Sequence, residues 1–168
     1  MSVAEHKAKA KRSLDCFVLT VSDTRDKASD QSGQLIKSLL AENGHRLIGY
    51  EIVKDEPAQI EALLLDALNR TDVEAIIVNG GTGISPRDGT YEVVCRLLEK
   101  RLDGFGEIFR FLSYQDIGPA AMMSRAVAGT AKRKVLVSLP GSRGAVDLAM
   151  RKLLLPELGH MVSQLKGQ

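Results

Sequence analysis

The stretch Ala75-Ile-Ile-Val-Asn79, which runs directly into Gly80-Gly-Thr-Gly83-Ile-Ser-Pro-Arg-Asp88, decides the fold. An uninterrupted apolar run of this length, closed by turn residues, is typical of a strand buried on both faces of a parallel sheet. Glycines placed immediately after a strand let the backbone adopt positive φ and come close to a ligand. The sequence therefore predicts a buried strand that ends in a binding loop.

Further strands and helices alternate on both sides of this stretch. Strands are expected over 16–21, 47–53 and 134–139, and helices over 34–42, 57–68, 91–102, 106–114 and 143–165, the last bent at Pro156. The small-residue segment 120–128 receives no element. This alternation predicts an α/β fold, a three-layer sandwich with a mostly parallel mixed sheet.

The composition describes one ordinary domain with a short basic extension. The chain has 168 residues, of which 44% are hydrophobic and 4% aromatic, which suits a single aliphatic core. The first twelve residues carry four basic side chains against Glu5, whereas the rest carries 19 basic and 20 acidic ones. We expect a flexible basic tail over 1–13, a single domain over 14–168, and no binding of nucleic acid, because the body lacks a basic surface.

Other features favour a cytoplasmic protein. No apolar run is long enough to span a membrane, and the basic start lacks the apolar stretch of a secretory signal. Cys16 and Cys95 lie in apolar contexts, without metal-binding spacing, and are expected to be buried reduced thiols.

Four loops should meet at one edge of the sheet, because ligands of such folds sit at the carboxyl ends of the strands. In the loop 80–88, backbone N–H groups can form a concave anion site, Thr82 and Ser85 add hydroxyls, and Arg87 adds positive charge. Asp88 would then be useful if Mg²⁺ bridges it to phosphates. The alternative is a tight turn in which Asp88 caps the next helix.

The other loops carry weaker signals. Asp55 is either a helix N-cap or a second carboxylate facing Asp88. The turn Pro140-Gly141-Ser142 begins a helix, and Ser142 should cap it whether or not an anion binds there. Ser22-Asp23 forms a polar cluster at a strand end. Arg125, which follows Ser124, could hold a phosphate with its planar fork or pair with a neighbouring acid.

These residues together resemble a known family. The motifs are Val21-Ser-Asp-Thr-Arg25, Asp30-Gln-Ser-Gly33, Gly80-Gly-Thr-Gly83 with Arg87-Asp88, Gly104-Phe-Gly-Glu107, Ser124-Arg125 and Leu139-Pro-Gly-Ser142. In this order, over about residues 14 to 165, they resemble the MoaB/MogA family of molybdenum cofactor biosynthesis proteins, and the first and fourth look closer to the MoaB branch.

The resemblance implies a molybdopterin-binding, MogA-like fold whose mixed sheet contains one antiparallel strand. It implies a homo-oligomer, a trimer or a hexamer, and contacts with other enzymes of molybdenum cofactor biosynthesis. The implied activity is molybdopterin adenylyltransferase, in which molybdopterin and ATP, with Mg²⁺, give adenylyl-molybdopterin and pyrophosphate. The alternative is a molybdopterin carrier or storage protein without turnover.

The resemblance also implies roles for particular residues. Asp55 and Asp88 would be catalytic and would hold Mg²⁺ or the terminal phosphate of molybdopterin. The dithiolene-phosphate end of the pterin would lie on the loop 80–83, bound by its backbone and by Thr82. The full set of expected binding residues is Ser22, Asp23, Gly80, Gly81, Thr82, Gly83, Ser85, Ser124, Arg125, Pro140, Gly141 and Ser142.

Overall fold

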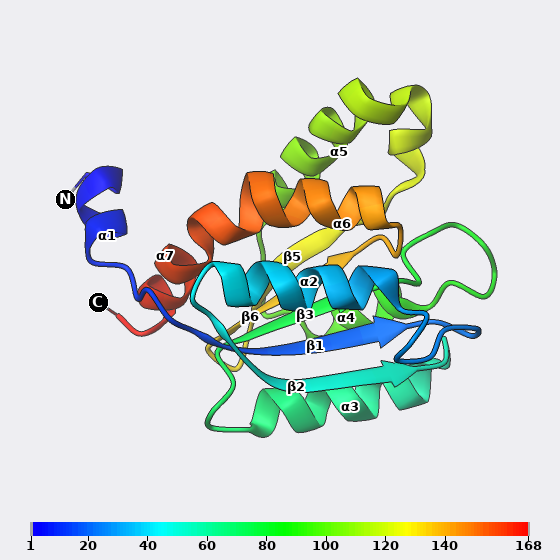
Figure 1. Ribbon diagram of the computed structural model, residues 1–168, viewed down its shortest axis with the longest axis horizontal. Coiled ribbons are helices and arrows are strands. Elements are labelled where there is room, and N and C mark those ends of the chain that lie inside the picture. Colours follow the sequence, from blue (N-terminus) through cyan, green and yellow to red (C-terminus); the bar gives the residue numbers. More distant parts are fainter. Residues whose placement is uncertain (1, 168) are drawn as a thin grey trace.

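The computed structural model, which describes residues 2–167, is built around one mixed sheet (Figure 1). The strands are β1 (Asp15–Val21), β2 (Arg46–Val53), β3 (Ala75–Asn79), β4 (Lys100–Arg101), β5 (Val127–Ala131) and β6 (Lys134–Leu139), in the order β2-β1-β3-β6-β5-β4. β2, β1, β3 and β6 pair in parallel. β5 runs antiparallel to both β6 and β4. The expected mixed sheet with one reversed strand is confirmed.

Helices cover both faces of the sheet and complete the three-layer sandwich. α2 (Gln31–Glu42), α6 (Arg143–Ala149) and α7 (Leu155–Leu165) lie on one face, and α3 (Pro57–Asn69) and α4 (Thr90–Leu97) lie on the other (Figure 1). α5 (Asp103–Ile117) packs on α6 and β5 and then extends away from the sheet together with the 3₁₀ helix η1 (Gly118–Met123).

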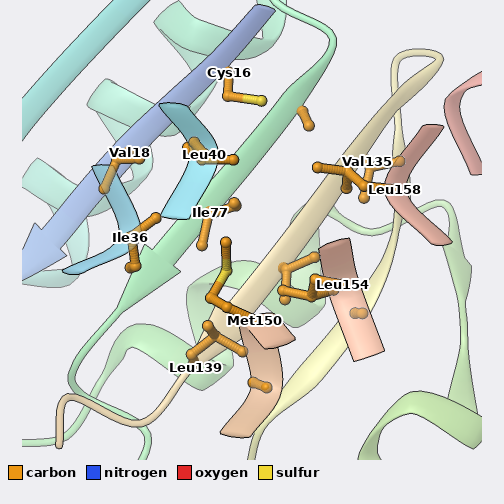
Figure 2. Close-up of a cluster of buried hydrophobic side chains, with 14 of the residues drawn as sticks. Cys16, Val18, Ile36, Leu40, Ile77, Val135, Leu139, Met150, Leu154 and Leu158 are labelled. Carbon is orange, nitrogen blue, oxygen red and sulfur yellow. The ribbon is translucent and has the colours of Figure 1, made fainter. Parts of the chain in front are cut away.

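The apolar runs of the strands supply two cores, one on each side of the sheet. Along β1, Cys16 and Val18 point toward α2 and α6, whereas Phe17 and Leu19 point toward α3 and α4. Figure 2 shows the first core, where side chains of β1, β3 and β6 meet those of α2 and the C-terminal helices. The sheet is thus anchored on both faces, which positions the loops at its carboxyl edge.

The expected helix over 91–102 is too long. α4 ends at Leu97, and the residues that follow form β4 at the edge of the sheet. Glu99 N–H donates to Thr130 O, and Leu102 N–H donates to Ala128 O, each at 2.8 Å. These cross-strand hydrogen bonds override a local sequence that is compatible with a helix.

Two other expectations also need correction. The segment 120–128, expected to hold no element, contains most of η1 and the start of β5. The C-terminal helix is interrupted before Pro156 by a π-helical turn, η2 (Met150–Leu154), in which Leu155 N–H donates to Met150 O. Because proline cannot donate and clashes with the preceding turn, the change of register occurs just ahead of it.

The N-terminal segment, expected to be a flexible tail, contains a short helix, α1 (Val3–Ala8). Lys7 pairs with Glu157 of α7, and Lys11 Nζ lies 2.8 Å from Glu74 Oε1 at the start of β3. These contacts lie at the amino end of the parallel strands. The mobility of residues 1–13 in solution stays a prediction.

Cys16 is buried as expected, but Cys95 is only half-buried, and both are free thiols. Among the helices of residues 2–167, none combines the length and the hydrophobicity needed to cross a bilayer.

Candidate functional site

The four predicted loops meet at the carboxyl edge of the sheet. Ser22 N–H donates to Val53 O at 2.8 Å, which joins the ends of β1 and β2. Gly80 N–H donates to Leu139 O at 2.9 Å, which joins the ends of β3 and β6. Asp23 Oδ1 accepts the Asp55 N–H at 3.1 Å. The polar residues that follow four separate strands therefore form one continuous surface.

The glycine loop needs glycine for steric reasons at its first positions. Gly80 and Gly81 have φ of +101° and +66°, in the left-handed region. A Cβ on Gly80 would lie 2.1 Å from Val21 O, and a Cβ on Gly81 would lie 2.1 Å from Thr90 Oγ1 and 2.6 Å from Asp55 Oδ2. The loop is thus packed against the end of β1 and against the Asp55 carboxylate.

Asp55 is a buried carboxylate beneath this loop, with a relative exposure of 6%. Its Oδ1 accepts the Gly89 N–H at 3.1 Å, and the N-cap of α3 is Glu56, so Asp55 is not the helix cap. Burial raises the pKa of Asp55, and the negative charges of Asp88 and Asp23 add to this, against the lowering effect of the Gly89 hydrogen bond. A carboxylate that is buried near other negative charges, with its pKa raised, is a candidate functional group.

Asp88 closes the glycine loop on itself. Its Oδ2 accepts the Ser85 N–H at 2.9 Å and lies 2.7 Å from the position that a Cβ on Gly83 would take. The N-cap of α4 is Gly89, so Asp88 does not cap that helix either. The two carboxylates therefore contact different glycines of the loop, Asp55 against Gly81 and Asp88 against Gly83.

Arg87 joins the loop to its neighbours. Its Nε donates to Asp23 Oδ2 at 2.9 Å, and its Nη2 lies 2.8 Å from Glu56 Oε1. The hydrogen bond from Arg87 is the main reason that the pKa of Asp23 is lowered. Arg87, whose positive charge was expected to attract an anion, is therefore paired with the carboxylates of Asp23 and Glu56.

Arg125 reaches the same loop from the opposite side. Its Nη2 donates to Gly83 O at 2.6 Å, and its Nε donates to Thr82 O at 3.2 Å. The guanidinium also pairs with Glu92 and lies 4.7 Å from the centre of the Tyr91 ring. The sequence left two roles open for Arg125, binding a phosphate and pairing with a neighbouring acid. The structure shows the second, the ion pair with Glu92. Within residues 2–167, the buried Ser124 Oγ has no hydrogen-bond partner.

The turn at Pro140 is held by residues that sequence reasoning did not single out. Gly141 O accepts hydrogen bonds from Arg25 Nη2 at 3.0 Å and from Ser32 Oγ at 2.7 Å. Ser142 Oγ accepts the Ala145 N–H at 3.3 Å, which confirms the predicted cap. Arg25 and Ser32 lie in two of the motifs quoted above, but their contacts with this turn depend on tertiary structure.

A fully buried aspartate supports this corner of the site. Asp30 accepts hydrogen bonds from Thr20 Oγ1 at 2.6 Å, from Tyr50 Oη at 2.5 Å and from Gly33 N at 2.9 Å. The last contact makes Asp30 the N-cap of α2. Burial raises the pKa of Tyr50, and its hydrogen bond to Asp30 raises it further.

A hollow of about 460 Å³ opens beside the glycine loop. Its walls are Pro57, Ile84, Ser85, Pro86, Asp88, Gly89, Glu92, Arg96 and Arg125. Glu92 and Arg96 were missed by sequence reasoning because they lie on α4, away from any glycine-rich turn. The hollow places space for a ligand beside Asp88 and the loop 80–88.

The donor set suits a hard cation only in part. Asp55 and Asp88 offer the carboxylate oxygens that Mg²⁺ prefers. Within the described part of the chain, however, no group of three or more His, Cys, Asp or Glu side chains could hold a metal ion. These residues fit Mg²⁺ if a bound ligand supplies the remaining oxygens.

The fold and this edge define an α/β protein with a glycine-rich loop that contacts two carboxylates, and comparison with known proteins identifies its family. The family described as "Probable molybdopterin binding domain" matches residues 17–160. Molybdenum cofactor biosynthesis protein B of Bacillus cereus is 52% identical, over all of both chains.

Two solved structures agree with this comparison. A crystal structure of a molybdenum cofactor biosynthesis protein B has a TM-score of 0.91 at 51% identity, covering 95% of this chain and 100% of the other. A MogA structure has a TM-score of 0.81 at 31% identity, covering 90% and 99%. The chain belongs to the MoaB/MogA family of molybdenum cofactor biosynthesis proteins and contains its molybdopterin-binding domain. The higher identity to MoaB proteins confirms the predicted branch.

Proposed function

We propose that the protein adenylylates molybdopterin. The observation that carries the proposal is the pair of carboxylates, Asp55 and Asp88, which lie against Gly81 and Gly83 of the glycine loop. In the reaction, a terminal phosphate oxygen of molybdopterin attacks the α-phosphorus of ATP. The bond from that phosphorus to the bridging oxygen of the β-phosphate breaks, and pyrophosphate leaves.

The residues of the site act mainly by positioning charge. The N–H groups of Gly81 to Gly83 and the Thr82 hydroxyl would bind the phosphate end of the pterin, with Ser85 beside them. Gly80, whose N–H donates to Leu139 O, would shape the start of the loop. Ser22, Asp23 and the turn Pro140–Ser142 would close the pocket on the β1 and β6 side. Mg²⁺, when bound with ATP, would neutralise phosphate charge and would be held by oxygens of Asp55 and Asp88.

The test is incubation of the purified protein with molybdopterin, ATP and Mg²⁺, with detection of adenylyl-molybdopterin and pyrophosphate. We expect Asp88→Ala to lower product formation by about 100-fold or more, because it removes an oxygen ligand of the Mg²⁺ that would neutralise phosphate charge. Asp72→Ala is the matched control, because Asp72 pairs with Arg70 near the opposite end of β3.

Two outcomes would contradict the proposal. Full transfer by Asp88→Ala would remove Asp88 from the mechanism. Retained molybdopterin binding without any product from the unmodified protein would favour the second reading, a molybdopterin carrier or storage protein.

Self-association is part of the same proposal. Six large apolar side chains of α5 and η1 are exposed: Ile108, Phe111, Tyr114, Ile117, Met122 and Met123. The first four recur every three residues along α5, so that each is a neighbour of the next on the helix surface. A surface of this kind usually marks an interface. We assign it to contacts between copies of the chain in a trimer or hexamer. Contact with other enzymes of the biosynthesis and a cytoplasmic location, which suits two free thiols, also stay predictions.

A further inference from the structure

Arginine side chains bind backbone carbonyls in two of the proposed ligand loops. Arg125 donates to Thr82 O and Gly83 O in the glycine loop. Arg25 donates to Gly141 O in the turn after β6. Both loops follow strands at the same edge of the sheet, and both would present backbone N–H groups to an anion.

This arrangement matters because an anion site made of N–H groups works only if the adjacent carbonyls point away from it. A carbonyl oxygen that faces a phosphate repels it, and a loop containing several glycines can rotate its peptide units with little steric resistance. A planar guanidinium that binds two successive carbonyls fixes the orientation of the peptide units to which they belong.

Arg125 is itself held in place by α4. The guanidinium pairs with Glu92, and it lies over the ring of Tyr91, the preceding residue of that helix. A third carbonyl, Asp88 O, lies 3.4 Å from Nη2. The donors of Arg125 are therefore directed at loop carbonyls and at Glu92, which leaves little capacity for a phosphate.

We propose that Arg125 is a positioning residue that clamps the glycine loop in its anion-binding conformation, rather than a ligand of the phosphate. The inference rests on the proposed function only in taking molybdopterin as the ligand of this loop. In this proposal, molybdopterin binding requires the planar guanidinium group of Arg125 with its several N–H donors, and not only its positive charge.

The first test compares Arg125→Lys with the unmodified protein. Molybdopterin affinity is measured at equilibrium, and amide hydrogen exchange is followed over residues 80–88 and over β1 and β3. We expect at least tenfold weaker binding and at least tenfold faster exchange in the loop, with exchange in the strands unchanged. Arg46→Gln is the control, since Arg46 pairs with Asp15 at the far end of the sheet.

A direct phosphate ligand predicts different results. Lysine keeps the charge and is itself a good phosphate ligand, so near-normal affinity with unchanged loop exchange in Arg125→Lys would overturn the clamp. Faster exchange in the strands as well would indicate general destabilisation by Arg125→Lys. In that case Glu92→Gln decides whether Arg125 positions the loop or binds the phosphate.

Glu92→Gln separates the two roles by the sign of its effect. The clamp predicts weaker molybdopterin binding, because Arg125 loses its anchor on α4. A ligand role predicts equal or tighter binding, because a competing carboxylate is removed. If the unmodified protein binds molybdopterin but makes no product, adenylylation fails while these measurements still test the clamp.

Discussion

At the scale of the residue, the buried charge of Asp55 lowers the stability of the folded protein near neutral pH. The carboxylate is buried beside Gly81 and near two other acids, which raises its pKa. The native state therefore binds this proton more tightly than the unfolded chain does. Stability linked to Asp55 is present at low pH and is lost as the pH rises from the ordinary value of an aspartate through the raised native value.

Asp55→Asn should therefore stabilise the protein near neutral pH while lowering its proposed activity. The amide oxygen can still accept the Gly89 N–H, and the buried charge is gone. We expect a gain of about 1 kcal/mol, which is roughly 2–4 °C in Tm for a chain of this size, with transfer reduced on the order of 100-fold. Thermal unfolding at pH 4 and pH 7 checks this prediction. A Tm difference that does not grow with pH would contradict the assigned cause.

At the scale of the element, the loop 80–88 is determined by backbone conformation and by contacts from three directions. Gly80 packs against the end of β1, Gly81 packs against Asp55 and Thr90, and Arg125 holds the carbonyls of Thr82 and Gly83. The loop is thus part of the packed structure, which favours a site formed before the ligand arrives.

Gly81→Ala tests that rigidity. The new methyl group would meet Thr90 and Asp55 in a left-handed backbone conformation, so we expect a loss of about 2–4 kcal/mol in the free energy of unfolding. Gly104→Ala in α5 is the matched control, because, apart from its chain neighbours and the backbone of its own helix, no atom of the described residues lies within 4 Å of its Cβ position. That substitution should change stability by about 1 kcal/mol or less, in the favourable direction. Equal effects in urea unfolding would show that the loop adapts.

At the scale of the whole molecule, the two ends of the sheet have different roles. The carboxyl edge gathers the loops, the carboxylates and the arginines that hold the loop carbonyls. The amino edge ties the chain ends together, because Lys11 and Lys166 both bind Glu74 at the start of β3. Burial opposes this charge, but these lysines and the Asp15 N–H lower the pKa of Glu74 to about 2. Substitutions at the amino edge therefore serve as controls for those at the site.

The apolar surface of α5 belongs to the same scale. Phe111 is 63% exposed, and Phe111→Asp should convert the proposed oligomer into monomers, because a charge buried in an interface costs several kcal/mol unless it is paired. Light scattering after size exclusion measures the mass directly. Since the Phe111 side chain points away from the packed face of α5, the variant should keep its fold, which circular dichroism checks. A monomeric unmodified protein would contradict the assignment of this surface.

The sequence by itself determined the parallel part of the fold and the edge of the sheet at which the candidate site lies. Apolar runs such as Ala75–Asn79 can only be buried on both faces, and glycines after a strand mark a close approach of the backbone, so both features follow from local chemistry. Asp55, Asp88 and the turn at Ser142 were placed at one edge by a third rule, that ligand loops of such folds lie at the carboxyl ends of the strands.

Only the tertiary structure decided the rest. β4 forms because Glu99 and Leu102, on either side of it, donate hydrogen bonds to β5, a strand about 30 residues away, which no local pattern encodes. β5 itself pairs with β6 across the two-residue turn of Lys132 and Arg133. The caps of α3 and α4 fall on Glu56 and Gly89, which frees Asp55 and Asp88 for other contacts. The direction of the Arg125 guanidinium depends on the packing of α4 against the glycine loop. Long-range hydrogen bonds and packing choose among conformations that the local sequence permits equally.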